Sequence, residues 1–382
     1  MTPPDGSPRQ PAVVPAEEDL PTVRRLAGEV LGTDPTVISE IGNGNLNQVF
    51  RASSARDSVV IKRAVPYVHS VGRSWPLSSA RVITEARAYE VHHAASPGRL
   101  PGLRGRDDDA RLLAIEDIAG LDCRSWLSSD RPAPSIATAV GDYCADIVQR
   151  TSPGAMSGAR WDELRAAFTD TTMRDFTDRV VFRAPFEDDP TNSWPAHLRE
   201  RRSLVTDDPA ILRTAAHARA VFLGRADCLL HGDLHSGSVL FDGTRTAIID
   251  LEFAFFGPAA FDIGNFLAHL YFARARRHAL GESAARRAEI DQLATEFCET
   301  VTRRLAGSGA PTGLAAEAAL FAGSELLRRI VGRFAVADLV ELPTAARESA
   351  ERAVFSAWHN LFRSHHTVTT FTEIWHTAEG TR

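Results

Sequence analysis

The sequence has few cysteines, no long apolar stretch and no excess of positive charge. Its 382 residues include four cysteines, and no two of them form a CxxC pair. This spacing argues against a zinc site and a disulfide framework, and it favours a reducing, cytoplasmic location. No apolar run has the length of a membrane span, and the N-terminus lacks the basic start and apolar core of a secretory signal. A formal net charge of -6 makes nucleic acid a poor candidate partner.

What the sequence does contain is the composition of a globular protein, in a chain long enough for two lobes. Apolar residues make up 44% and charged residues 24%. Residues 1–17 are rich in proline and polar residues, which predicts a disordered tail. Strand patterns dominate up to about residue 117, and helical patterns dominate afterwards. We therefore expect an α+β fold with a small, β-rich N-lobe over residues 18–117 and a larger, mainly helical C-lobe over residues 118–382.

Periodicity predicts the main elements of the N-lobe. A first helix is expected to run through Val23–Leu31. Three short strands are expected over residues 36–41, 48–52 and 58–62, where apolar residues alternate between turn signals. Helical spacing over residues 79–94 places four residues on one side of a second helix: Val82, Ala86, Tyr89 and His93.

Two carboxylates frame a short strand–turn–strand segment further along the chain. Asp233 follows the apolar pair Leu229 and Leu230, and Asp250 ends the second of the two strands. Each aspartate alone is well explained as an ordinary turn residue. Together they suit phosphoryl transfer, in which one carboxylate accepts the proton of the acceptor hydroxyl and another holds Mg²⁺ against the phosphates. Glu252, two residues after Asp250, is a second candidate metal ligand.

A glycine- and asparagine-rich turn joins the first two predicted strands. It lies between strands and no GKS or GKT follows it, which argues against a dinucleotide-binding motif and a P-loop. Such a turn usually only reverses the chain, but in kinases bare backbone N–H groups of this kind cover the triphosphate. The residues of the turn that we assign to nucleotide binding are Gly42, Asn43, Gly44, Asn45 and Asn47.

A lysine and a glutamate strengthen the kinase interpretation. Lys62 ends the third predicted strand, where a kinase places the lysine that contacts the α- and β-phosphates. Glu85, on the next helix, is its natural ion-pair partner. Residues 115–118 follow a buried strand and would form the hinge, where Glu116 and Ile118 would read adenine through their backbone groups. Each of these residues, taken alone, has an ordinary structural explanation. Their order along the chain, a turn, a lysine, a glutamate and two aspartates, favours the kinase interpretation.

These residues lie in segments that resemble the S-methyl-5-thioribose kinases, a branch of the aminoglycoside phosphotransferase and choline kinase-like group with a protein-kinase-like fold. The resemblance extends from about residue 37 to residue 340. The segments that carry it are EIGNGNLNQVF (40–50), VIKRAVPYVHSVGRSWPL (60–77), IED (115–117), FTDRVVFRAPFEDDPTN (176–192), LLHGDLHSGSVLF (229–241), IDLEFAFFGPAAFDIGNF (249–266) and ELLRRIVGRFAVADL (325–339).

The resemblance implies ATP and Mg²⁺ as cofactors, a homodimer, and phosphorylation of the anomeric hydroxyl of a thioribose. Asp233 resembles the catalytic base, and Asp250 and Glu252 resemble the Mg²⁺ ligands. Arg328 and Arg329 resemble the paired arginines of the sugar site. Trp75 lies in the segment that resembles a tryptophan-bearing loop near the active site, although a tryptophan packed in the lobe's core fits the composition equally well. Asp262 and His231 are expected to hold the catalytic loop, and His235 is open to either role.

Three positions depart from the family pattern, and the two in the loop around residues 69–73 concern the acceptor. Leu251 replaces a usual proline, Arg73 stands where an acidic residue is usual, and His69 stands where a basic residue is usual. A different 5-modified pentose therefore remains open as the substrate. The alternatives are a phosphotransferase for an antibiotic, a nucleoside or another specialised-metabolite hydroxyl, and a catalytically silent kinase-like binding module. The presence of Lys62, Asp233 and Asp250 argues against the silent module.

Overall fold

The computed structural model describes residues 20–41, 46–131 and 136–380, and it contains two compact units. The first unit comprises Met1–Glu90 and Pro101–Ala119. The second comprises Val91–Leu100 and Gly120–Arg382. The tail predicted for residues 1–17, and the predicted nucleotide contacts Gly42, Asn43, Gly44 and Asn45, lie outside the described residues.

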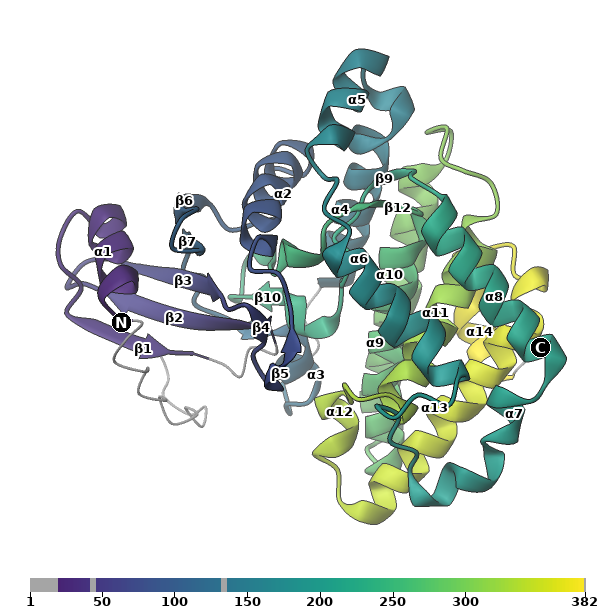
Figure 1. The fold of residues 1–382 in the computed structure, drawn as a ribbon. Coiled ribbons are helices and arrows are strands. Elements are labelled where there is room, and N and C mark those ends of the chain that lie inside the picture. The colour runs from purple at the N-terminus through teal and green to yellow at the C-terminus, as the bar shows by residue number, and fades with distance from the viewer. Residues whose placement is uncertain (1–19, 42–45, 132–135, 381–382) are drawn as a thin grey trace. The chain divides into compact units, whose positions relative to one another are not determined.

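The first unit contains an antiparallel sheet (Figure 1). Its strands, in spatial order, are β1 (Val37–Glu40), β2 (Asn47–Ser53), β3 (Ser58–Ala64), β7 (Leu112–Glu116) and β6 (Leu103–Asp107). A separate hairpin joins β4 (Tyr67–Val68) and β5 (Gly72–Pro76). The three strands predicted from the alternation are confirmed as β1, β2 and β3.

Strand alternation divides the side chains of this sheet between its two faces. Helix α1 (Leu20–Leu31) packs against β2, β3, β6 and β7. Its Val23 and Leu26 form one core with Phe50 and Ile61 of the sheet. Since neighbouring residues of a strand point to opposite faces, Lys62 points away from this core.

Helix α2 (Arg81–Ala95) agrees with the predicted helix but buries a partly different set of side chains. Val82, Ala86 and Tyr89 are buried as predicted, whereas His93 is exposed. His92 is buried instead, and its Nδ1 lies 2.7 Å from the hydroxyl of Tyr143 in the second unit, the unit to which His92 also belongs. The prediction for His93 was wrong because this hydrogen bond decides which histidine the end of the helix buries.

The second unit is mainly helical, so the predicted α+β fold with a β-rich N-terminal part is confirmed. Its helices are α3 (Cys123–Leu127), α4 (Ile136–Thr151), α5 (Gly158–Ala166), α6 (Thr172–Thr177), α7 (Ser203–Thr206), α8 (Pro209–Gly224), α9 (Ala260–Ala279), α10 (Ala284–Leu305), α11 (Leu314–Val331), α12 (Ala337–Val340), α13 (Thr344–Ser364) and α14 (Phe371–Glu379). The long helices α9, α10, α11 and α13 pack side by side (Figure 1). In the part of the chain that the structure describes, no helix has the length and apolarity of a membrane span. All four cysteines are buried and free.

Short strands hold the loops that carry the predicted catalytic residues. In the second unit β9 (Cys228–Leu229) pairs with β12 (Phe256–Gly257). The predicted hairpin is confirmed as β10 (Val239–Phe241) paired with β11 (Thr246–Ile248), and β8 (Leu121–Asp122) adds to β10. The segment with Asp233 therefore runs from β9 to β10, and the segment with Asp250 runs from β11 to β12.

Candidate active site

The loop that carries Asp233 is held by a buried carboxylate behind it. Asp262, near the start of α9, accepts hydrogen bonds from the backbone N–H groups of His231 (2.7 Å) and Gly232 (3.0 Å). Burial raises the pKa of Asp262, and these two donors oppose that effect. Gly232 has a φ of +84°, and a Cβ atom there would come within 2.2 Å of the carbonyl oxygen of Phe253. The structural role predicted for Asp262 is confirmed.

His231 joins the segment that carries Asp233 to the segment that carries Asp250. It is fully buried, its Nδ1 accepts from the backbone N–H of Asp233 (3.2 Å), and its Nε2 lies 2.8 Å from the carbonyl oxygen of Ile249. The N–H of Ile249 donates in turn to the carbonyl of Ser238 (2.9 Å). Burial lowers the pKa of His231, which fits a neutral ring that accepts at one nitrogen and donates at the other. The predicted scaffold role of His231 is confirmed.

The carboxylate of Asp233 meets three cationic or donor groups, two from α11 and one from its own loop. Its Oδ1 lies 3.4 Å from Nη2 of Arg328 and 3.8 Å from Nη2 of Arg329, both on α11. Its Oδ2 lies 3.5 Å from Nε2 of His235. Nδ1 of His235 accepts from the backbone N–H groups of Gly237 and Ser238, so a neutral ring carries its proton on Nε2, facing Asp233. The structure thus brings together Asp233, Arg328 and Arg329 as the sequence predicted.

Glu325 lies beneath the two arginines and was not predicted as a site residue. Its side chain is 1% exposed, and it accepts from Nε of Arg328 (2.5 Å) and from Nε of Arg329 (2.6 Å). Burial by itself raises the pKa of Glu325, but the charges of Arg328 and Arg329 outweigh burial and hold the pKa well below its usual range. The carboxylate is therefore ionised at neutral pH.

A histidine connects Glu325 to the loop that carries Asp233. Nε2 of His269, on α9, lies 3.1 Å from Oε1 of Glu325, and its Nδ1 lies 3.2 Å from Oγ of Ser236. Burial lowers the pKa of His269 to about 3, so the ring is neutral at neutral pH. The spacing of Glu325, Arg328 and Arg329 along one helix face could have revealed the first contact. No local signal points to His269, because it lies 56 residues from Glu325.

The predicted metal ligands lie on the segment that follows β11. Asp250 has φ +66° and ψ +54°, a left-handed backbone that non-glycine residues adopt rarely and that is concentrated at functional sites. Glu252, in the short helical turn after it, is 7% exposed. Two carboxylates suit Mg²⁺, which is usually bound by one or two carboxylates together with phosphate oxygens and water. Among the described residues no group of three or more His, Cys, Asp or Glu side chains forms a metal cage.

In the first unit the predicted ion pair is present. Nζ of Lys62 lies 2.5 Å from Oε1 of Glu85, and the two side chains are 3% and 0% exposed. Asn47, the one predicted residue of the turn region that the structure describes, is buried and accepts from Nη2 of Arg81 (2.7 Å). Contact of these groups with a nucleotide stays a prediction.

The remaining predicted residues of the first unit are placed as follows. Trp75 lies on β5 and is half-buried, so it is not a core tryptophan. The carboxylate of Glu116 accepts from the backbone N–H of Gly102 (2.9 Å), and Ile118 is buried. The Glu116 side chain therefore joins β6 and β7, and a role of this segment in reading adenine stays a prediction.

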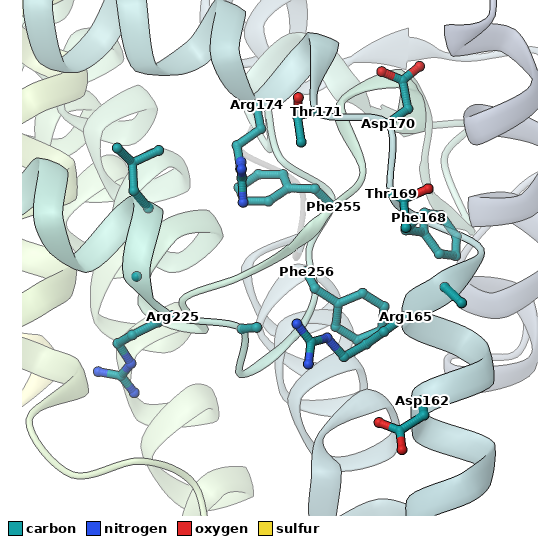
Figure 2. A pocket seen from close by; sticks show the side chains of 14 residues that line it. Asp162, Arg165, Phe168, Thr169, Asp170, Thr171, Arg174, Arg225, Phe255 and Phe256 are labelled. Atoms are coloured by element: carbon teal, nitrogen blue, oxygen red, sulfur yellow. The ribbon is translucent and has the colours of Figure 1, made fainter.

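A cavity of about 480 Å³ in the second unit contains none of the predicted site residues. Figure 2 shows side chains that line it, among them Arg165, Arg174, Phe255 and Phe256. Phe255 and Phe256 follow the Asp250 segment, and the carbonyl of Phe255 accepts from the N–H of Leu230, just before the Asp233 loop (2.9 Å). The wall of the cavity therefore continues the segment that carries Asp250 and is hydrogen-bonded to the backbone just before Asp233.

Comparison with known proteins identifies relatives of this chain. The methylthioribose kinase of Exiguobacterium sibiricum is 31% identical over 341 residues, which cover 85% of this chain and 87% of that protein. The methylthioribose kinase of Bacillus cereus is 32% identical over 324 residues, 80% of this chain and 81% of that protein. A solved spectinomycin phosphotransferase is similar with a TM-score of 0.49 and 14% identity, over 96% of this chain and 100% of that one. Residues 37–297 match the model of the phosphotransferase enzyme family. The chain therefore belongs to this phosphotransferase enzyme family of small-molecule kinases and is a relative of the methylthioribose kinases.

Proposed function

We propose that this protein is an ATP-dependent kinase that phosphorylates the 1-hydroxyl of 5-methylthioribose or of a similar 5-modified pentose. The observation that carries the proposal is the position of Asp233, held on a fixed loop with two arginines of α11 at its carboxylate. The identity of 31–32% to methylthioribose kinases over most of the chain supports the choice of acceptor.

In the proposed reaction Asp233 acts as general base. The oxygen of the 1-hydroxyl forms a bond to the γ-phosphorus of ATP, its proton passes to the Asp233 carboxylate, and the bond from the γ-phosphorus to the bridging oxygen breaks, which releases ADP. Asp250 and Glu252 would hold Mg²⁺, which neutralises charge on the triphosphate. Lys62, oriented by Glu85, would contact the α- and β-phosphates, and the backbone of the hinge around Glu116 and Ile118 would read adenine.

The charges of the arginine pair and of the two nearby carboxylates favour the proposed reaction. Arg328 and Arg329 carry two positive charges, and Glu325 and Asp233 carry two negative charges, so the group is neutral before reaction while His269 is neutral. When Asp233 accepts the proton, one positive charge is no longer compensated. It then faces the phosphoryl group, whose oxygens carry negative charge in the transition state. The same arginines would repel a cationic antibiotic, which argues against an aminoglycoside acceptor.

The test is turnover of Mg-ATP by the purified protein with methylthioribose, 5-deoxyribose, ribose and one aminoglycoside. The proposal expects fast turnover of methylthioribose and slow turnover of the aminoglycoside. A thermal shift with Mg-ATP distinguishes a protein that binds nucleotide without turning over an acceptor from a protein that does not bind nucleotide. A ligand at 100 times its Kd stabilises the fold by about 2.7 kcal/mol. Binding of Mg-ATP without turnover of any acceptor would contradict the proposed substrate and direct attention to the loop around Arg73.

We also propose that the protein is a homodimer, as the resemblance to the methylthioribose kinases implies. Sedimentation equilibrium of the purified chain tests this independently of activity. A mass of a single 41.6 kDa chain at micromolar concentration would contradict it.

A further inference from the structure

We propose that Glu325 is a positioning residue for the catalytic site: it orients Arg328 and Arg329 toward Asp233, and His269 joins it to the catalytic loop through Ser236. The inference rests on the proposed kinase function for its effect on turnover. The network itself is a property of the folded protein and can be tested with no substrate present.

The helix places the three charged side chains on one face. Glu325 is followed by Arg328 and Arg329 at i+3 and i+4, so both guanidinium groups reach back to the same carboxylate. Each arginine uses its Nε for Glu325, at 2.5 and 2.6 Å, and directs an Nη2 toward Asp233, at 3.4 and 3.8 Å. A guanidinium is planar and rigid, so fixing its Nε–H direction restricts where the Nη2–H group points.

The proton positions of the network follow from the charge of Glu325. An ionised carboxylate can only accept, so His269 must donate to it from Nε2. A neutral imidazole then has no proton on Nδ1, which becomes an acceptor for the hydroxyl of Ser236. Ser236 is part of the same loop as Asp233. The arginine pair and the base are thus connected twice, directly across the site and through the buried chain of Glu325, His269 and Ser236.

A second buried glutamate supplies a matched control. Glu351, on α13, is 2% exposed and accepts from Nε of Arg347 (2.7 Å), and its Oε2 lies 3.2 Å from Nε2 of His197. Like Glu325, it pairs with an arginine four residues away on its own helix and lies close to a histidine from elsewhere. Among the described residues, neither Arg347 nor His197 forms a hydrogen bond or ion pair with the segments that carry Asp233 and Asp250. A purely structural effect of removing a buried glutamate charge should therefore appear in both variants.

The first experiment compares Glu325→Gln with Glu351→Gln by steady-state kinetics and thermal unfolding. We expect both variants to lose stability, and only Glu325→Gln to lose turnover, with a kcat reduced about 100-fold because the arginines are displaced from the reacting group. The KM for Mg-ATP should stay within about twofold in both, since the nucleotide contacts are untouched. A folded Glu325→Gln variant with wild-type kcat would overturn the proposal.

The second experiment reads the network in the wild-type protein by ¹⁵N NMR of labelled histidine, with His269→Gln to assign the signal. The proposal expects a neutral His269 with its proton on Nε2 across pH 6 to 8, and a change in that signal in Ser236→Ala. A proton on Nδ1, or no response to Ser236→Ala, would overturn it even if Glu325→Gln does not fold. Failure of the proposed function would appear differently, as a wild-type protein that phosphorylates no acceptor while these signals are as expected.

Discussion

Glu325 and Asp338 are both almost completely buried carboxylates of the second unit, yet their surroundings have opposite effects. Glu325, 1% exposed, accepts from two arginines and a histidine, and its pKa lies well below the usual range. Asp338, 2% exposed, has no hydrogen-bond donor from another described residue at either carboxylate oxygen, and burial raises its pKa to about 6. Partners, and not burial alone, therefore decide whether an interior carboxylate stays charged.

The ion pair of the first unit gives a buried carboxylate a third kind of surrounding, with a single cationic partner. Lys62 and Glu85 form a buried pair of one cation and one anion. The Glu325 cluster instead holds two cations on one anion, and the second cation is compensated by Asp233. A balanced pair can orient a lysine, whereas a cluster with one extra cation can respond to a change of charge at Asp233.

The largest effect is expected from Asp233→Asn, which removes the proposed base and the charge that the second arginine compensates. We expect kcat to fall by about 1,000-fold, within the range of general-base catalysis. Steady-state kinetics measures the loss, and calorimetric titration with Mg-ATP should show unchanged affinity. Near-normal turnover of this variant would show that Asp233 is not the base.

Lys62→Met breaks the balanced pair and leaves the Glu85 charge buried with its main cation gone. We expect the free energy of unfolding to fall by about 3–5 kcal/mol, as for other buried pairs that lose one partner. The double variant Lys62→Met with Glu85→Leu removes both charges and should recover most of this loss in urea unfolding. If the double variant is no more stable than the single one, the packing of Lys62 and not its charge explains the effect.

Asp338→Asn tests how the buried carboxylate, which has no hydrogen-bond donor from another described residue, makes stability depend on pH. The folded-state pKa of Asp338 lies above its unfolded value, so the wild type is penalised as pH rises from about 4 to about 6 and the group ionises. The asparagine variant carries no such penalty. Its stability relative to the wild type should therefore increase across this window, by on the order of 2–3 kcal/mol. Urea unfolding at pH 4.5 and pH 7.5 measures the change, and a difference that is independent of pH would contradict it.

The smallest effect is expected from Asp250→Ala, which removes a carboxylate that we assign to a cation from solution. The Mg²⁺ concentration for half-maximal turnover should rise at least about tenfold, which corresponds to about 1.4 kcal/mol. A titration of activity with Mg²⁺ at fixed ATP measures it. Glu252→Gln should act in the same direction, and an unchanged Mg²⁺ requirement in both variants would remove these residues from the metal site.

The contacts that could be predicted from the sequence are those with local patterns. Alternation predicted β1, β2 and β3, and the hairpin of β10 and β11 followed from strand patterns around an Asp–Gly turn. The partnership of Lys62 and Glu85 followed from the order of a strand and a helix in a kinase-like chain.

The parts that could not be predicted depend on contacts between distant segments. His269 meets Glu325 and Ser236 only because α9 packs against α11 and the loop that carries Asp233. His92 is buried in place of His93 because its ring reaches the hydroxyl of Tyr143. Such contacts are set by tertiary packing, which leaves no periodic signal in the chain. Asp338 likewise reads as an ordinary polar residue of a short helix, and only its burial distinguishes it.

The identity of the product is the best test of whether the phosphoryl group is transferred to the 1-hydroxyl of a 5-modified pentose, as we propose. Methylthioribose labelled with ¹³C at C1 should give, with Mg-ATP and the wild-type protein, a phosphate ester whose ³¹P signal couples to the labelled carbon. The Asp233→Asn variant should form it far more slowly. A phosphate attached at another carbon, or ADP formation without any sugar phosphate, would contradict the claim.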